Sequence, residues 1–150
     1  MGSAGTLYHN KDFITSDEPF FICYADNLTN TNLSKMLEFH SQKQALLTMR
    51  LFHAQNPSAC GIVELDNNDK IINFEEKPLY PKSNLANGGI YITNNKIFNF
   101  FNENHKDLGK DILPFLPDTY GYYTDEYLLD IGTMENYVKA GKDVENGLFN

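Results

Sequence analysis

The sequence predicts one α/β domain in which helices flank a sheet. Apolar and aromatic residues run without interruption over residues 19–24 and again over residues 45–53, and each run has the length of a buried strand. Between them, apolar residues recur at helical spacing over residues 32–42. Strand, helix and strand in that order are typical of a βαβ unit with parallel strands.

The first strand is bounded by polar residues. Residues 19–24 are followed by Ala25-Asp26-Asn27, and the unbroken apolar run predicts burial on both faces of a parallel sheet. Residues 29–31 are polar and are candidates for capping the helix that follows.

The second half of the chain predicts a hairpin and then shorter elements. Residues 61–65 and 70–75 have the pattern of two strands joined by a tight polar turn. A strand over residues 86–93 contains Gly88 and Gly89, which allow close backbone approach. The remaining elements are expected as short helices over residues 96–101 and 110–116, short strands over residues 120–124 and 127–130, and a terminal helix over residues 134–144 opened by Thr133. With no repeat or linker, residues 1–150 are interpreted as a single domain.

Composition argues against two classes of partner. The net charge is −8, the pI is near 4.8 and the 12 basic residues are scattered, so the chain has no basic footprint for nucleic acid or an anionic membrane. No apolar stretch approaches the roughly 20 residues that span a bilayer. No signal peptide opens the sequence, and a cytoplasmic protein is therefore expected. Cys23 and Cys60 lie in apolar runs, which predicts two buried free thiols.

Two aspartates follow predicted strands. Asp26 comes directly after the first strand, at the sheet edge where ligands bind in α/β proteins. It could hold a divalent cation or simply cap the next helix, and position alone does not separate these roles. Asp130 ends a later strand and is followed by Ile131-Gly132-Thr133. Two carboxylates from different strand ends could share one Mg²⁺.

A third candidate lies at the exit of the hairpin, in the sequence Glu75-Glu76-Lys77-Pro78. Lys77 supplies a point charge for a phosphate, and Glu76 could accept hydrogen bonds from sugar hydroxyls. The alternative is a solvated turn, which is the usual role of such a charged run.

Five segments occur in an order that matches one enzyme family. They are Gly-Ser-Ala-Gly-Thr-Leu at residues 2–7, Tyr-Ala-Asp-Asn-Leu at 24–28, Phe-Glu-Glu-Lys-Pro at 74–78, Asn-Gly-Gly-Ile-Tyr at 87–91 and Leu-Asp-Ile-Gly-Thr at 129–133. With these segments the chain resembles the bacterial sugar-1-phosphate nucleotidyltransferases, most closely the mannose-1-phosphate guanylyltransferase type.

The resemblance implies a fold, a reaction and site residues. The implied fold is a truncated Rossmann-like (GT-A-like) mixed sheet flanked by helices, the C-terminal part of a nucleotidyltransferase domain. The implied reaction joins a sugar 1-phosphate to an NTP and releases pyrophosphate, with Mg²⁺ as cofactor. The implied roles are Mg²⁺ binding by Asp26 and Asp130, sugar-phosphate binding by Lys77, sugar-hydroxyl binding by Glu76 and Asn87, and backbone approach to the nucleotide at Gly5 and to the sugar at Gly89.

The sequence also departs from the family pattern. The N-terminal Gly-rich loop that grips the nucleotide phosphates is not found, Ala25 replaces a Gly and Gly88 replaces an Ala. Three interpretations stay open: a fragment of a full enzyme, one chain of an enzyme whose Gly-rich half is separate, or a non-catalytic sugar-phosphate-binding module. Without the N-terminal half, the strand at residues 20–24 would have a free edge, which predicts a homo-oligomer formed through that edge.

Overall fold

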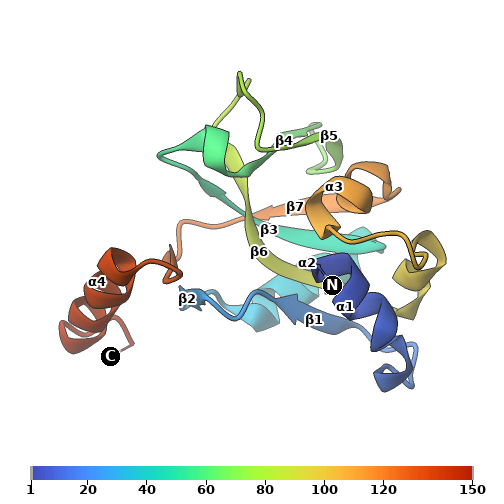
Figure 1. Cartoon of the computed structure of the whole chain (residues 1–150), viewed down its shortest axis with the longest axis horizontal. Coiled ribbons are helices and arrows are strands. Elements are labelled where there is room, and N and C mark those ends of the chain that lie inside the picture. The colour runs from blue at the N-terminus through green and yellow to red at the C-terminus, as the bar shows by residue number, and fades with distance from the viewer. Residues whose placement is uncertain (1, 150) are drawn as a thin grey trace.

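The computed structural model describes residues 2–149, and its centre is a twisted mixed sheet (Figure 1). The strands are β1 (Phe20–Cys23), β2 (Asn27–Thr29), β3 (Leu47–His53), β4 (Gly61–Leu65), β5 (Ile71–Glu76), β6 (Leu85–Thr93), β7 (Thr119–Tyr123) and β8 (Leu128–Asp130). The helices are α1 (Ser3–His9), α2 (Leu33–Lys43), α3 (Leu108–Asp111) and α4 (Met134–Glu145), with 3₁₀ turns η1 (Lys11–Phe13), η2 (Pro57–Ala59), η3 (Asn95–Phe100) and η4 (Leu113–Phe115).

Strand β6 organises the sheet. The order is β5-β4-β6-β3-β7, and β1 pairs with the second half of β6 on the side where β4 meets its start. Because β1 and β3 are both antiparallel to β6, they run parallel to each other with β6 between them. The expected mixed sheet flanked by helices is confirmed, but the predicted adjacent parallel strands are not. Among the strands of residues 2–149, only β3 and β7 pair in parallel. Strand β6, from later in the chain, lies between β1 and β3.

Strand β1 is less buried than the sequence predicted. Phe20 and Ile22 are half-buried against the core, whereas Phe21 and Cys23 on the other face are exposed. The prediction of burial on both faces is wrong, and so is the prediction of a buried Cys23 thiol. Within residues 2–149, β1 pairs with β6 alone and its other edge is free.

Most of the predicted elements form near their expected positions because their signals are local. Asn32 caps α2 by accepting a hydrogen bond from the Lys35 amide at 3.0 Å, one residue after the capping candidates predicted at residues 29–31. Thr133 caps α4 as expected. In the hairpin turn, the Asp66 carboxylate accepts from the amides of Asn68 and Lys70. Helix α1 and the short strand β2 were not anticipated.

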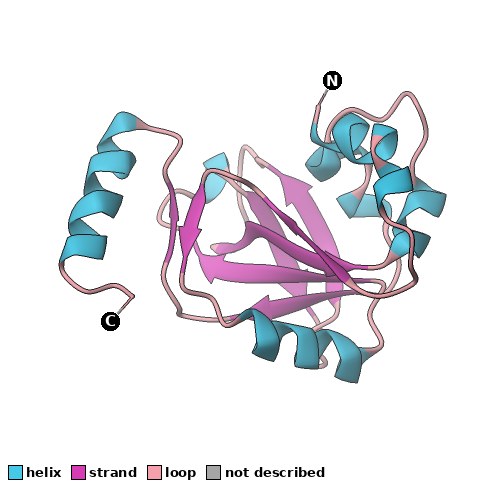
Figure 2. Ribbon diagram, turned by 90° about the horizontal axis from the view of Figure 1, so that it is seen from below, coloured by secondary structure: helices cyan, strands magenta, loops and turns pink. Residues whose placement is uncertain are grey.

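Two apolar cores lie against the helices that flank the sheet, and a third, small cluster joins Ala54, Ile62 and Ala86. The larger packs Leu47, Met49 and Leu51 of β3 against α1, α3 and the hairpin. The smaller places Met36 of α2 on Ile90 and Ile92 of β6. Figure 2 shows α2 on one side of the strands and the short helices on the other. Helix α4 lies apart from the main sheet and is joined to it through β8 (Figure 1).

Candidate functional site

The two predicted metal-binding aspartates lie close together. Asp26 immediately precedes β2, Asp130 ends β8, and these strands form a separate two-stranded sheet in which Asn27 faces Asp130. A methyl group placed on Gly132 would lie 2.9 Å from Asp130 Oδ1 and 3.5 Å from Asp26 Oδ2. The Ile131 amide also donates to the Asp26 carbonyl at 2.7 Å. Both aspartates are exposed, so the structure brings two solvent-accessible carboxylates to one point.

These two carboxylates fit the way proteins hold Mg²⁺. Magnesium is usually bound by one or two carboxylates while water and substrate phosphates complete its shell. Asp130 Oδ1 accepts a 2.7 Å hydrogen bond from the Gly132 amide, which fixes the orientation of that carboxylate. In the described part of the chain, no group of three or more His, Cys, Asp or Glu side chains could hold a metal. The donor set thus suits a cation that substrate helps to bind.

Glu76 lies in a space left by two glycines. Its Oε2 is 2.8 Å from the position of a methyl group on Gly61 and 2.7 Å from that of one on Gly109, the second residue of α3. A side chain at either glycine would displace the carboxylate. Burial raises the pKa of Glu76 and is the largest influence. The charges of Lys77 and Lys110 lower this pKa to smaller extents, and that of Asp107 raises it. A half-buried acceptor of this kind gains most from a hydroxyl donor on a ligand.

Lys77 is exposed directly after β5. Its backbone adopts a left-handed conformation with φ of +50°, and its amide donates to the Cys60 carbonyl at 3.0 Å. The backbone is therefore held at the hairpin exit while the side chain stays in solvent, where its ammonium group can meet an anion.

Asn87 and Gly89 lie in an irregular part of β6. Met49 pairs with Tyr91 and Leu51 with Asn87, so residues 88–90 bulge opposite a single residue of β3. The Asn87 side chain donates to Tyr91 Oη at 2.8 Å and accepts from the Gly89 amide at 3.0 Å. These bonds stabilise the bulge and leave one amide hydrogen and one lone pair of Asn87 for a ligand.

Gly89 is required by the bulge. Its φ is +69°, and a methyl group there would lie 2.7 Å from Asn27 Nδ2 and 2.8 Å from the Tyr24 ring. The Tyr24 amide donates to the Gly89 carbonyl at 3.0 Å, and Asn27 Nδ2 donates to the Gly88 carbonyl at 3.0 Å. The bulge of β6 is thus tied to the segment that carries Asp26.

Cys60 lies at the hairpin exit, where its carbonyl accepts from the Lys77 amide. Burial raises the pKa of its thiol and is the largest influence. The charges of Glu76 and Asp130 raise this pKa to smaller extents, and that of Lys77 lowers it. The adjacent Gly61 leaves the space that the Glu76 carboxylate occupies. A shallow groove at the end of β1 is lined by Cys23, Tyr24, Ala25 and Asp26.

Gly5, for which the resemblance implied an approach to the nucleotide, is a helix residue in this structure, and that role stays a prediction. It is buried inside α1, and its carbonyl oxygen lies 2.8 Å from His9 Nδ1. Helix α1 packs on α3, where the Ala4 amide donates to the Lys106 carbonyl and the Leu108 amide donates to Ser3 Oγ. In this structure the segment over residues 2–7 supports α3 behind Glu76, because its apolar residues join the main core.

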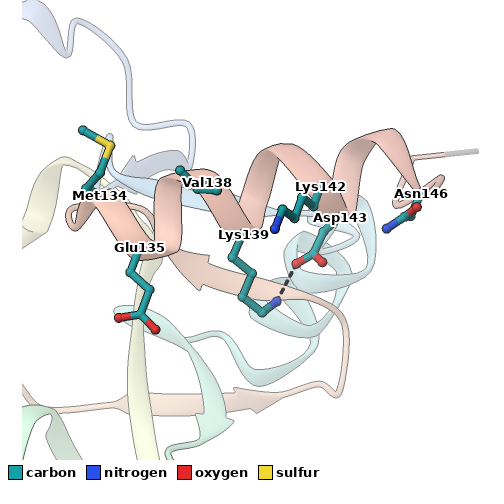
Figure 3. Close-up of a pocket in the computed structure, with 7 residues that line it drawn as sticks. All are labelled: Met134, Glu135, Val138, Lys139, Lys142, Asp143 and Asn146. Carbon is teal, nitrogen blue, oxygen red and sulfur yellow. Dashed lines mark hydrogen bonds and ion pairs between the residues drawn. The ribbon is translucent and has the colours of Figure 1, made fainter.

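Sequence reasoning missed several residues of this region. Tyr24, Cys60, Gly61, Asp107 and Gly109 surround Glu76 or the β6 bulge. Gly109 and Asp107 had no local signal, since their importance depends on α3 packing behind β5. A second shallow groove follows one side of α4, and none of its lining residues is a predicted site residue; they are Met134, Glu135, Val138, Lys139, Lys142, Asp143 and Asn146 (Figure 3).

The chain resembles known proteins along almost its whole length. The model of the family described as nucleotidyl transferase matches residues 1–147. The glucose-1-phosphate adenylyltransferase of Clostridium novyi (strain NT) is 36% identical, over 96% of this chain and 42% of that protein. The enzyme of the same name from Clostridioides difficile (strain 630) is 33% identical, over 95% of this chain and 41% of that protein. The chain thus spans about two fifths of the length of these curated relatives.

Solved structures share the fold. HddC from Yersinia pseudotuberculosis complexed with GMP-PN has a TM-score of 0.77 at 22% identity, with 95% of this chain and 62% of that chain covered. A putative glucose-1-phosphate thymidylyltransferase from Bacillus anthracis in complex with a sucrose has a TM-score of 0.78 at 23% identity, with 94% and 60% covered. The guanylyltransferase subtype stays a prediction, because the curated relatives named here are adenylyltransferases. Between residues 2 and 149, no helix is both long and apolar enough to cross a bilayer.

Proposed function

The chain belongs to the nucleotidyl transferase family, and from this premise we propose that it forms the sugar-phosphate and metal-binding part of a sugar-1-phosphate nucleotidyltransferase site. One observation carries the proposal: Asp26 and Asp130, from two separate sequence motifs, meet at Gly132. Asn27, next to Asp26, also donates to the Gly88 carbonyl in the bulge of a third motif. NTPs and sugar phosphates are cytoplasmic metabolites, so the proposal places the protein in the cytoplasm.

In the proposed reaction, an oxygen of the sugar phosphate attacks the α-phosphorus of an NTP. A new P–O bond forms, the bond between the α- and β-phosphates breaks, and pyrophosphate leaves with the electron pair. No covalent enzyme intermediate is needed, so the residues act by orienting the reactants and by stabilising charge. Mg²⁺, when bound by Asp26 and Asp130, would supply positive charge for the phosphate oxygens.

Lys77 and Glu76 would bind different parts of the sugar phosphate. The Lys77 ammonium would pair with the phosphate, while the adjacent Glu76 carboxylate would accept from sugar hydroxyls. Two carbonyl groups of the β6 bulge are already used by Tyr24 and Asn27, which keeps the bulge rigid. Asn87 would use its remaining donor and acceptor on the sugar, next to the close backbone approach at Gly89.

Binding of glucose 1-phosphate and mannose 1-phosphate tests this assignment. We expect weak binding of one or both by the 150-residue chain, and Lys77→Ala should weaken it measurably because a charged phosphate partner is lost. Lys35→Ala, at an exposed site on α2, is the matched control. Calorimetry or ligand-observed NMR measures the affinity, with glucose as the ligand that lacks phosphate.

The outcomes separate the alternatives. Equal binding by wild type and Lys77→Ala, or binding of glucose as tight as that of its phosphate, would contradict the role of Lys77. Binding of sugar phosphate that is insensitive to Asp26→Asn and to Mg²⁺ would instead support a non-catalytic sugar-phosphate-binding module.

A further inference from the structure

Arg50, in the middle of β3, is fully buried (0% exposed). Charged side chains are almost never buried to this extent unless they are paired. Its Nη2 donates to the Glu126 backbone carbonyl at 2.6 Å, and its Nε donates more weakly to Thr31 Oγ1 at 3.3 Å. Its Nη1 is buried with no hydrogen-bond partner. Burial lowers the pKa of Arg50, and the Glu126 charge opposes this shift.

The absence of a side chain at Gly88 leaves room for Arg50. A methyl group on Gly88 would lie 2.8 Å from Arg50 Cδ, 3.2 Å from its Nη1 and 3.0 Å from its carbonyl oxygen. Arg50 is the β3 residue opposite the bulge of β6, between the pairs formed by Met49 and Leu51. An alanine methyl at position 88 would therefore collide with the arginine.

Arg50 contacts three segments that lead to the proposed site. Thr31 follows β2, which begins next to Asp26. Glu126 precedes β8, which ends at Asp130. Gly88 belongs to the bulge, and its carbonyl accepts from Asn27 in β2.

We propose that Arg50 is a positioning residue that holds the small β2–β8 sheet, and with it Asp26 and Asp130, against the sugar-binding bulge of β6. The two aspartates lie outside the main sheet, so their distance from Glu76 and Lys77 depends on such connections. The guanidinium group suits this work because its rigid planar fork aims Nε and Nη2 at acceptors on two segments, whereas the donors of an ammonium group have no such fixed geometry. The inference rests on the proposed function for the roles of Asp26 and Asp130.

Native-state hydrogen exchange tests the connection without any ligand. The amides of Asn30 and Ile131 donate across the small sheet to Tyr127 and Asp26 and serve as reporters. In Arg50→Met they should exchange about tenfold faster than in the wild type, while the Gly121 amide in β7 follows global stability. Thr48→Val is the matched control, since Thr48 is equally buried on β3 but contacts His40 of α2.

Two further variants keep the experiment decisive. Arg50→Lys retains the charge but not the fork, so the same amides should exchange faster, and it replaces Arg50→Met should that variant not fold. Gly88→Ala should destabilise the wild type. In an Arg50→Ala background the same substitution should raise the unfolding equilibrium constant by a factor about ten times smaller. Unchanged exchange at Asn30 and Ile131 in both Arg50 variants would overturn the proposal, as would an equal effect of Thr48→Val.

Mn²⁺ titration extends the test to the aspartates. Broadening of the Gly132 amide should require several-fold more Mn²⁺ in Arg50→Met than in the wild type. Wild-type broadening that Arg50→Met leaves unchanged would overturn the positioning role. If the wild type binds no Mn²⁺, the proposed metal site fails, whereas hydrogen exchange still decides whether Arg50 holds the small sheet.

Discussion

Among the single residues of the site, Glu76 is the one whose charge burial disfavours most plainly. Its carboxylate is half-buried between Gly61 and Gly109, and burial raises its pKa above the ordinary value of 4.5. A site that holds a partly desolvated acceptor loses stability to gain a group that a ligand can satisfy. The Glu76 carboxylate thus lowers the stability of the fold and is also the proposed acceptor for a ligand hydroxyl.

Glu76→Gln should therefore stabilise the chain near neutral pH. The folded carboxyl group keeps its proton to a higher pH than the unfolded one. The contribution of Glu76 to the free energy of unfolding therefore falls as the pH rises from 4.5 through the raised pKa of the folded state. The free energy of unfolding of Glu76→Gln minus that of the wild type should grow over this window and then level off. Denaturant unfolding at several pH values measures it.

Glu75→Gln is the matched control because Glu75 is adjacent on β5 and points to the opposite face of the strand. The same stability profile in both variants would mean that the space between Gly61 and Gly109 does not penalise the Glu76 charge.

At the level of elements, the bulge of β6 depends on a glycine in a left-handed conformation. Gly89 has φ of +69° and lies against Asn27 and Tyr24, whereas Gly141 in α4 has nothing within 4 Å of its missing methyl group. These two glycines have opposite reasons to be present, since one is required by its surroundings and the other only lowers helix propensity.

Gly89→Ala should destabilise the chain by on the order of 2–5 kcal/mol, from backbone strain together with overpacking. Gly141→Ala should stabilise it by about 0.5–1 kcal/mol, because alanine loses less backbone entropy in a helix interior. Thermal or denaturant unfolding of both variants checks the pair. A tolerated Gly89→Ala would show that the bulge relaxes without loss of the contacts to Tyr24 and Asn27.

For the whole molecule, the proposed activity requires more than the sugar site. The sequence of 150 residues contains no Gly-rich loop of the kind that grips nucleotide phosphates. We expect that this chain alone forms no NDP-sugar from an NTP, a sugar 1-phosphate and Mg²⁺, because the leaving group is not stabilised. A labelled-phosphate assay measures turnover. Turnover that Asp26→Ala abolishes would contradict this expectation.

The free edge of β1 predicts self-association. Phe21, Cys23 and Tyr24 are exposed there, and within residues 2–149 the strand pairs on one side only. An unpaired apolar edge is a template for another strand, so we expect a homo-oligomer that joins through β1. Light scattering over a dilution series should report the oligomer for wild type and the monomer for Phe21→Lys.

A second surface provides the contrast for this experiment. Helix α4 stands apart from the sheet and exposes Tyr137 at 62% of its surface (Figure 1). Tyr137→Lys should leave the oligomer intact. Dissociation by this variant and not by Phe21→Lys would assign the contact to α4, and a monomeric wild type at tens of micromolar would refute self-association.

The features that were predictable from the amino-acid order are those whose causes lie within a few residues along the chain. The apolar spacing of α2, the Thr133 cap of α4 and the polar turn at Asp66 depend on local backbone geometry and local hydrogen bonds. The five ordered motifs likewise indicated the family, because each is a short contiguous segment.

Which distant segments meet could not be predicted from the sequence and is visible in the folded chain. The insertion of β6 between β1 and β3, the approach of Asp26 to Asp130, and the packing of Gly109 behind Glu76 all join segments far apart in the chain. No periodicity or cap encodes such pairings, since they arise from the packing of whole elements. Burial of Arg50 against Gly88 is the same kind of result: a charge that local rules place in solvent is enclosed because two strands and two loops close around it.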